Sequence, residues 1–230
     1  MWAQTSGTLV DGGGKLAVVQ DSNRWYHHLF PGKQATVFTA IQLDGRNAME
    51  ANAVSSVSML RRKVNVAPAD LGAVRFSWRV PALIATADMA QRDFDDSPVR
   101  IVLAFEGDRS KFSAKNTVLN ELSRAITGEE MPYAVMMYVW SKQRPLGTII
   151  NSPRTDRIRK LVVETGSENL NRWQHYERDI TADFERLYGE PPGALIGMGI
   201  MTDSDNTHTT AQAWYGPLQV LKRSVGKMMP

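Results

Sequence analysis

Apolar and polar residues alternate along several segments of this chain, and this period of two constrains the fold more than any other feature. In residues 74–80, valine, phenylalanine and tryptophan alternate with arginine and serine, and Pro81 ends the run. Residues 99–105 repeat the alternation between Pro98 and Gly107. Because successive side chains of a strand point to opposite faces, each segment predicts a strand with one buried face and one polar face.

Seven further segments have the composition of strands. They are residues 35–41, 54–61, 133–140, 158–164, 173–180, 196–202 and 212–221. Residues 133–140 are apolar at nearly every position, which predicts a central strand covered on both faces. About nine strands separated by turn-forming residues predict an all-β, mainly antiparallel fold, a β-sandwich of jelly-roll type.

Two segments depart from this period and have apolar residues at helical spacing. One covers residues 118–126 and precedes Gly128, and the other covers residues 184–188 and precedes Gly189. Glycine is favoured just after a helix, so both segments predict short helical excursions between strands. No repeat or long linker divides the sequence, and we interpret residues 1–230 as a single β-sandwich domain.

The composition is globular and excludes several classes of function. The 230 residues contain no cysteine, which excludes thiolate zinc sites and a cysteine nucleophile. The apolar stretch 131–140 is about half of the roughly 20 residues that a membrane-spanning helix needs. The net charge of +3 comes without a basic run longer than Arg61–Lys63, so we expect no nucleic-acid partner. Nucleotide-binding glycine motifs and the serine-hydrolase motif are also missing from the sequence.

Several sequence blocks together resemble a known family. The blocks are FSWRV at 76–80, DDSPVR at 95–100 with AF at 104–105, MYVW at 137–140, RDI at 178–180 with YGEPP at 188–192, MTDSDNT at 201–207 and AWYG at 213–216. In order and spacing they resemble the bacterial domain-of-unknown-function family numbered 3047 over about residues 35–220. The resemblance implies a bacterial protein that is periplasmic or secreted once its leader is removed, with a cytoplasmic location as the alternative. It brings no catalytic residues, and its strand-rich pattern is similar to that of carbohydrate-binding modules and some polysaccharide lyases.

The densest group of polar residues is the segment Thr202–His208, which follows a predicted strand. Asp203, Asp205 and Asn206 carry oxygen atoms that a calcium ion or a sugar would bind, with Asp203 and Asp205 as the metal ligands. The segment does not match an EF-hand, because His208 and Trp214 stand where that motif has glycine and glutamate. A turn held by side-chain hydrogen bonds to its own backbone is the alternative interpretation.

A second acidic group, Asp93, Asp95 and Asp96, precedes the strand that carries Arg100. These carboxylates either lie in a solvated loop, pair with the neighbouring arginine, or face Asp203 and Asp205 across a cleft. The last arrangement requires both loops to lie at the same end of the sandwich.

Aromatic residues complete the predicted ligand site, since flat rings on a sheet stack against sugars. We assign Trp140, Trp214 and Tyr215 to this site together with the polar residues Asp95, Asp96, Asp203, Asp205, Asn206 and His208. Trp140 shares an alternation face with core candidates, so packing is its alternative role.

These features predict non-catalytic binding of a carbohydrate or another polar small ligand. No catalytic residue is assigned, and calcium is the one cofactor considered. Two alternatives remain open. One is a polysaccharide-active enzyme, either a lyase or a glycoside hydrolase, and the other is a structural or protein-interaction component of the bacterial envelope.

Overall fold

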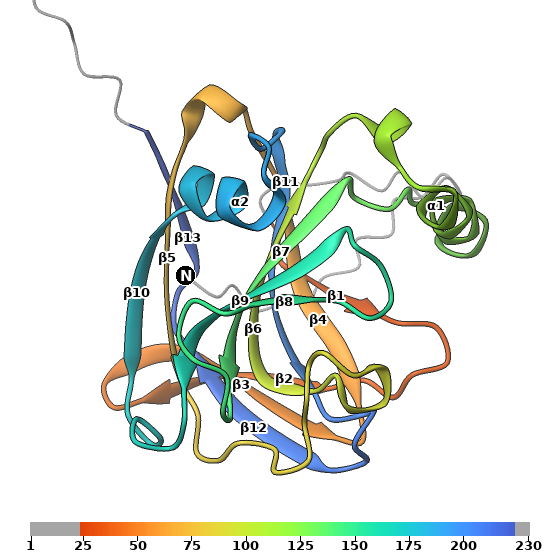
Figure 1. Cartoon of the computed structure of the whole chain (residues 1–230). Helices are drawn as coiled ribbons and strands as arrows, with labels where there is room; N and C mark the ends of the chain where they lie inside the picture. The colour runs from red at the N-terminus through yellow and green to blue at the C-terminus, as the bar shows by residue number, and fades with distance from the viewer. Residues whose placement is uncertain (1–23, 224–230) are drawn as a thin grey trace, which may run out of the picture.

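Thirteen strands and two α-helices form within residues 24–223, the part of the chain that the computed structural model describes (Figure 1). The seven-stranded sheet contains, in spatial order, β1 (Tyr26–Leu29), β4 (Val57–Val66), β11 (Leu195–Asp203), β6 (Ser97–Phe105), β7 (Ala134–Ser141), β9 (Ile158–Thr165) and β8 (Ile149–Asn151). The six-stranded sheet contains β10 (Gln174–Asp179), β5 (Leu71–Arg79), β12 (Thr210–Tyr215), β3 (Arg46–Val54) and β2 (Val37–Leu43), with β13 (Gln219–Lys222) paired to β5.

Strand pairing shows that the sandwich is a jelly roll. The chain alternates between the two sheets from β3 to β6, and again from β10 to β12. On the return path β10 pairs with β5, β11 with β4 and β12 with β3, all antiparallel. Two stretches of chain therefore wrap around the core side by side, which is the jelly-roll arrangement. The pair β7 and β9 is parallel. The predicted fold class, a mainly antiparallel jelly-roll sandwich, is confirmed.

The core lies between the two sheets and is built by the predicted alternation. Val74, Phe76 and Trp78 of β5 point inward and are at most 2% exposed. Phe76 stacks on Tyr138 of the opposite sheet with ring centroids 5.3 Å apart. Phe184 of α2 (Ile180–Tyr188) is fully buried and joins the same core. Apolar side chains from both sheets and from α2 thus form one continuous hydrophobic cluster.

Two predicted segments do not coincide with one strand each. Residues 54–61 contain the turn between β3 and β4, where Ser55 adopts a positive φ of 46°. Residues 212–221 are interrupted after β12, because Gly216 approaches β5 so closely that a Cβ there would lie 2.1 Å from Ser77 Oγ. The strands β1 and β8 were not predicted, and neither was β3 apart from its last residue, Val54. A count of about nine strands was therefore too low.

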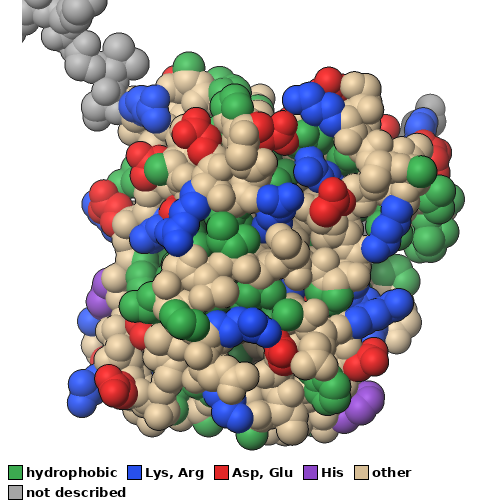
Figure 2. All heavy atoms as spheres, in the orientation of Figure 1, with side chains coloured by type: hydrophobic (Ala, Val, Ile, Leu, Met, Phe, Trp, Pro, Cys, Tyr) green, Lys and Arg blue, Asp and Glu red, His purple; other side chains and the backbone are tan. Residues whose placement is uncertain are grey.

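The helix α1 (Ala114–Thr127) turns its polar side toward the protein. Asn116 is 1% exposed and donates a hydrogen bond to Asp156 Oδ1 at 2.6 Å. The apolar residues whose spacing predicted the helix lie on its outer side, where Val118, Leu122 and Ile126 are 67%, 52% and 59% exposed. Figure 2 accordingly shows exposed hydrophobic side chains where Figure 1 places α1. No helix within residues 24–223 is long and apolar enough to cross a membrane.

The two environments predict different responses to the same substitution. Val74→Ala should lower the free energy of unfolding by about 2 kcal/mol, because it removes two buried methyl groups and leaves a cavity. Val118→Ala should change it by less than about 0.5 kcal/mol, because the side chain is exposed. Urea denaturation of both variants measures this difference. Equal losses would contradict the exposed position of Val118.

Candidate ligand-binding cleft

A cleft of about 790 Å³ lies on the outer face of the seven-stranded sheet. On β6 the core residues alternate with Arg100, Val102 and Ala104, so these three side chains point away from the core and line the cleft. Val135 and Met137 of β7 do the same on the neighbouring strand. The lining also includes Met59, Ile158, Gly197, Met198 and Met201. The floor of the cleft is therefore mainly aliphatic and thioether surface.

Charged side chains surround this apolar floor. The basic residues of the lining are Lys33, Arg61, Arg62, Lys63, Arg100, Arg109, Arg154 and Lys160, and the acidic ones are Asp95, Glu106, Glu129, Glu130, Asp203 and Asp205. Eight basic residues against six acidic ones give the lining a formal excess of two positive charges. The rings of Tyr26 and Phe30 add aromatic surface.

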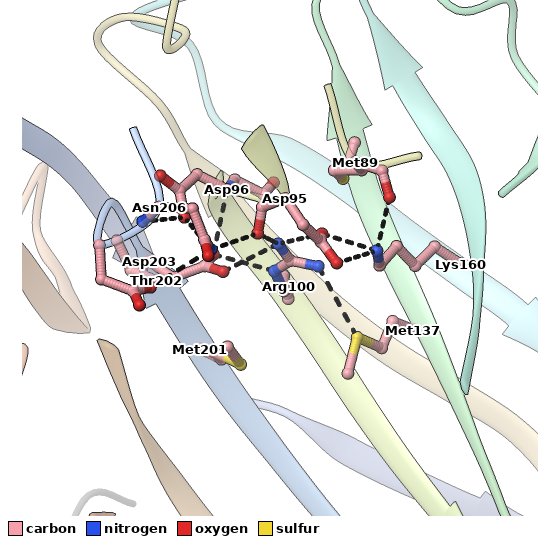
Figure 3. Close-up of polar contacts among 12 residues, drawn as sticks. Met89, Asp95, Asp96, Arg100, Met137, Lys160, Met201, Thr202, Asp203 and Asn206 are labelled. Carbon is pink, nitrogen blue, oxygen red and sulfur yellow. Dashed lines mark hydrogen bonds and ion pairs between the residues drawn. The ribbon is translucent and has the colours of Figure 1, made fainter. Parts of the chain in front are cut away.

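Arg100 lies at the centre of a buried ion-pair network (Figure 3). Its Nε and Nη2 atoms donate to the two carboxylate oxygens of Asp203 at 2.9 and 2.8 Å. Nη2 also donates to Asp95 Oδ1 at 3.0 Å and to the Asp95 carbonyl at 2.8 Å. Strand pairing places Asp203 opposite Ser97, whose backbone N–H donates to Asp203 Oδ1 at 3.0 Å. The antiparallel register of β6 and β11 thus sets this geometry.

Lys160 extends the network to a further strand. Its Nζ atom donates to both carboxylate oxygens of Asp95, at 2.6 and 2.7 Å, and to the carbonyl of Met89 at 2.8 Å. The side chains of Arg100 and Lys160 are 2% and 1% exposed. We call Asp95, Arg100, Lys160 and Asp203 the buried charge cluster. Its two cations and two carboxylates balance one another formally.

Burial shifts the titration of the cluster. It raises the pKa of Asp203 to about 7, although Arg100 opposes the rise. Burial, followed by the charge of Arg100, lowers the pKa of Lys160 to about 8. Burial also disfavours the charged form of Arg100, but Asp203 and Asp95 outweigh this and raise its pKa above the usual value. Each charge in the cluster therefore depends on its partners for the stabilisation that water gives elsewhere.

The two acidic loops predicted from sequence lie at the same end of the sandwich. Asp96 accepts hydrogen bonds from the backbone and side chain of Asn206 and of Thr207, at 2.6 to 3.2 Å. Asp205 pairs with Lys33. Carboxylate oxygens of Asp96, Asp203 and Asp205 lie within 4.8 Å of one another. Because each of these carboxylates already accepts hydrogen bonds from the protein, the geometry is explained without a cation, and the calcium site stays a prediction.

The predicted site residues divide between the cleft and other places. Asp95, Asp203, Asp205 and Asn206 line the cleft, and Asp96 holds the loop that carries Asn206.

The aromatic residues and His208 lie elsewhere. Trp140 and Tyr215 are buried in the core, where Trp140 Nε1 donates to the Gly166 carbonyl at 3.0 Å. Trp214 lies on the outer face of the six-stranded sheet, on the opposite side of the sandwich, and His208 is exposed on a turn. None of these four residues lines the cleft.

Sequence reasoning did not assign Arg100 and Lys160 to the site. The signal was present at Arg100, a charged residue whose neighbours along the strand are apolar, and was weaker at Lys160, which follows Arg159. A buried charge requires a partner, so such a residue in a central strand indicates an ion pair or a site. The apolar floor carried no comparable signal, since its residues have the same types as the core.

The network predicts that Asp203 and Asp205 have different roles. Asp203→Ala should lower the free energy of unfolding by about 3 kcal/mol or more, because it leaves Arg100 buried without its bidentate partner. Asp205→Ala should cost about 1 kcal/mol or less, because Lys33 is 41% exposed and water can solvate it. Thermal or urea unfolding of the two variants measures the difference. A stable Asp203→Ala protein would show that the pair is dispensable.

Similarity to solved structures is weak. The family 11 carbohydrate-binding module of a cellulosomal cellulase of Clostridium thermocellum is 9% identical, with a TM-score of 0.39 over 86% of this chain and 88% of that chain. The same type of module from that organism, in complex with a β-1,3-1,4-mixed-linked tetrasaccharide, is 11% identical, with a TM-score of 0.37 over 93% of each chain. The xyloglucanase domain of NopAA, a type three effector from Sinorhizobium fredii in complex with cellobiose, is 7% identical. Its TM-score is 0.42, over 86% of this chain and 93% of that chain. Scores this low carry no argument about a ligand for this chain.

A family model matches far more directly. No curated protein matches the sequence. The model described as protein of unknown function (DUF3047) matches residues 23–219, which include the strands β1 to β12, both helices and the whole buried charge cluster. The chain therefore belongs to the family of proteins of unknown function DUF3047.

Proposed function

We propose that this protein binds a small ligand in the cleft on the outer face of the seven-stranded sheet, without catalysing a reaction on it. The observation that carries the proposal is the cleft itself. Its volume of about 790 Å³ falls within the roughly 300–1,000 Å³ that is typical of small-molecule sites. Such sites combine apolar surface with placed polar groups. This cleft has an apolar floor with charged side chains around it.

The state of the carboxylates favours binding over catalysis. A glycoside hydrolase needs one carboxyl group that gives a proton and a second that acts as base or nucleophile. Asp95 and Asp203 are both held in ion pairs with Arg100, and Asp95 also with Lys160. Their oxygens are directed toward Arg100 and Lys160 (Figure 3).

We propose a carbohydrate or another polar small molecule as the occupant, in a protein of the periplasm or of the extracellular space. Arg154, Asp205 and Asn206 supply hydrogen-bonding groups at the end of the cleft near the cluster. The Tyr26 ring supplies an aromatic face, and Arg61 lies 4.9 Å from its centroid. The family resemblance supports the proposed location, and the polar residues of the sequence support the proposed ligand class.

Filling the cleft tests the proposal. A Cβ at Gly197 would lie 3.6 Å from Ala104 Cβ, an ordinary contact, so the backbone there accepts a side chain, which would extend into the cleft. Gly197→Phe should therefore abolish the ligand-induced rise in melting temperature while the free protein still melts cooperatively. The probes are neutral and acidic mono- to tetrasaccharides. At a hundredfold excess over its dissociation constant, a ligand adds about 2.7 kcal/mol to the stability of the wild type.

Thr39→Phe is the matched control, because it adds the same ring to an exposed position of β2 in the other sheet. It should leave the response of the wild type unchanged. A saccharide response that survives Gly197→Phe would mean that binding occurs outside the cleft.

The exposed stripe of α1 favours a second candidate function, a protein-interaction role. Val118, Leu122 and Ile126 are each more than half exposed and lie one turn apart on one side of the helix. Solvent-exposed apolar surface of this kind is typical of association sites.

This second candidate predicts self-association that depends on α1. Leu122→Glu should abolish any concentration-dependent association in sedimentation experiments, because a charge cannot be buried in an apolar contact. Glu121→Gln, one position away, is the control. If the wild-type protein is monomeric at every concentration tested, self-association through this stripe is contradicted.

A further inference from the structure

Arg100 has hydrogen-bonding capacity that the protein does not use. A guanidinium group carries five N–H donors. Nε and Nη2 are occupied by Asp203 and Asp95, whereas the only partner of Nη1 within residues 24–223 is the Met137 sulfur, at 4.0 Å. A thioether is a weak acceptor and can take at most one of the two Nη1 protons. The Arg100 side chain is 2% exposed, so water does not satisfy the remaining Nη1 donor, and an unsatisfied buried donor is costly. Met137 lines the cleft, so a ligand in the cleft is the acceptor that this donor lacks.

The charge of the whole lining favours an anionic acceptor over a neutral one, whereas the charges of the buried charge cluster balance one another. The lining contains eight basic and six acidic residues. Arg61 and Arg62 on the same lining each have a buried Nε atom without a hydrogen-bond acceptor in the described part of the chain. An oxyanion gains from both the unused donors and the excess positive charge, whereas a neutral hydroxyl gains only from the donors.

The rest of the cleft favours an apolar body on the same ligand. Met137 and Met201 lie beside Arg100 (Figure 3), and Val102 and Ala104 continue the floor along β6. Methionine side chains adapt their shape to an apolar ligand, because they are unbranched and polarizable. A small hydrophilic anion such as acetate would leave this surface uncovered.

We infer that the ligand of the cleft is an amphipathic organic acid, whose anionic group accepts hydrogen bonds from Arg100 Nη1 and whose apolar part covers the methionine floor. This inference rests on the proposed function, since it names the chemical class that the same cleft binds. It separates the ligand from a neutral oligosaccharide, which has neither the charge nor the extended apolar part.

Three probes of the intact protein test the two halves of the inference. Calorimetric titration at neutral pH compares octanoate with octan-1-ol, which has the same chain without the charge, and with acetate, which has the charge without the chain. Octanoate should bind at least roughly tenfold more tightly than octan-1-ol, because hydrogen bonds to charged groups are the strong ones. Acetate should bind more weakly still. Raising the salt concentration should weaken octanoate binding and leave octan-1-ol binding unchanged.

Arg100→Lys tests the anchoring residue, because lysine keeps the charge and loses the Nη1 donor. Octanoate affinity should fall at least roughly tenfold while octan-1-ol affinity is retained. Arg75→Lys is the matched control, since Arg75 is an exposed arginine that pairs with Glu177 on the other sheet. Should Arg100→Lys fail to fold, the comparison of probes on the wild type and on Gly197→Phe decides the question.

The outcomes separate this inference from the proposed function. Equal affinity for octanoate and octan-1-ol, or acetate binding as tight as octanoate binding, overturns the inference. Saccharide binding that Gly197→Phe abolishes, together with no octanoate binding, keeps the proposed function and overturns the inference. Failure of every saccharide and of octanoate to bind the wild type overturns both.

Discussion

Alternation of side chains on the central strands of the seven-stranded sheet is the constraint on which both the core and the cleft depend. On β6, Ile101 and Leu103 enter the core, so Val102 and Ala104 must face the other way. A shift of one residue in strand register would exchange the two surfaces and place Arg100 between the sheets. The packed core therefore specifies the register, and the register in turn places the cleft lining.

The buried charge cluster makes this arrangement more specific. Removing Arg100 and Lys160 from water is costly, and the cost is offset only when Asp95 and Asp203 meet them in good geometry. Asp203 ends β11, whereas Asp95 belongs to the connection before β6 and Lys160 to β9. The cluster thus connects three parts of the chain that are distant in sequence. One guanidinium nitrogen, Arg100 Nη1, is left facing the cleft with a thioether as its partner.

In helix α1, unlike in the strands, the apolar side faces away from the protein. Its apolar residues have the spacing of a core-facing helix, yet hydrogen bonds of Asn116 and Asn120 hold the opposite side against the protein. Hydrophobic spacing predicted that a helix forms here, but not which of its sides packs. The same limit applies to the aromatic residues. Trp140, Trp214 and Tyr215 were grouped by residue type, and the structure distributes them between the core and the outer face of the six-stranded sheet.

The local sequence pattern was sufficient to predict the class of the fold. Period-two alternation, turn residues and helix-terminating glycines each determine structure over only a few residues. It identified β5, β6 and β7, both helices and the two acidic loops. It missed β3, placed the turn at Ser55 inside a strand and merged β12 with β13, since a turn at Ser55 or a close approach at Gly216 depends on neighbouring strands. The pairing of β11 with β4 and with β6, the contact of Arg100 with Asp203, and the cleft beside them were decided by tertiary structure alone. Each depends on contacts between residues that are far apart in sequence, and only the folded sheet fixes which face of one strand lies beside which face of another.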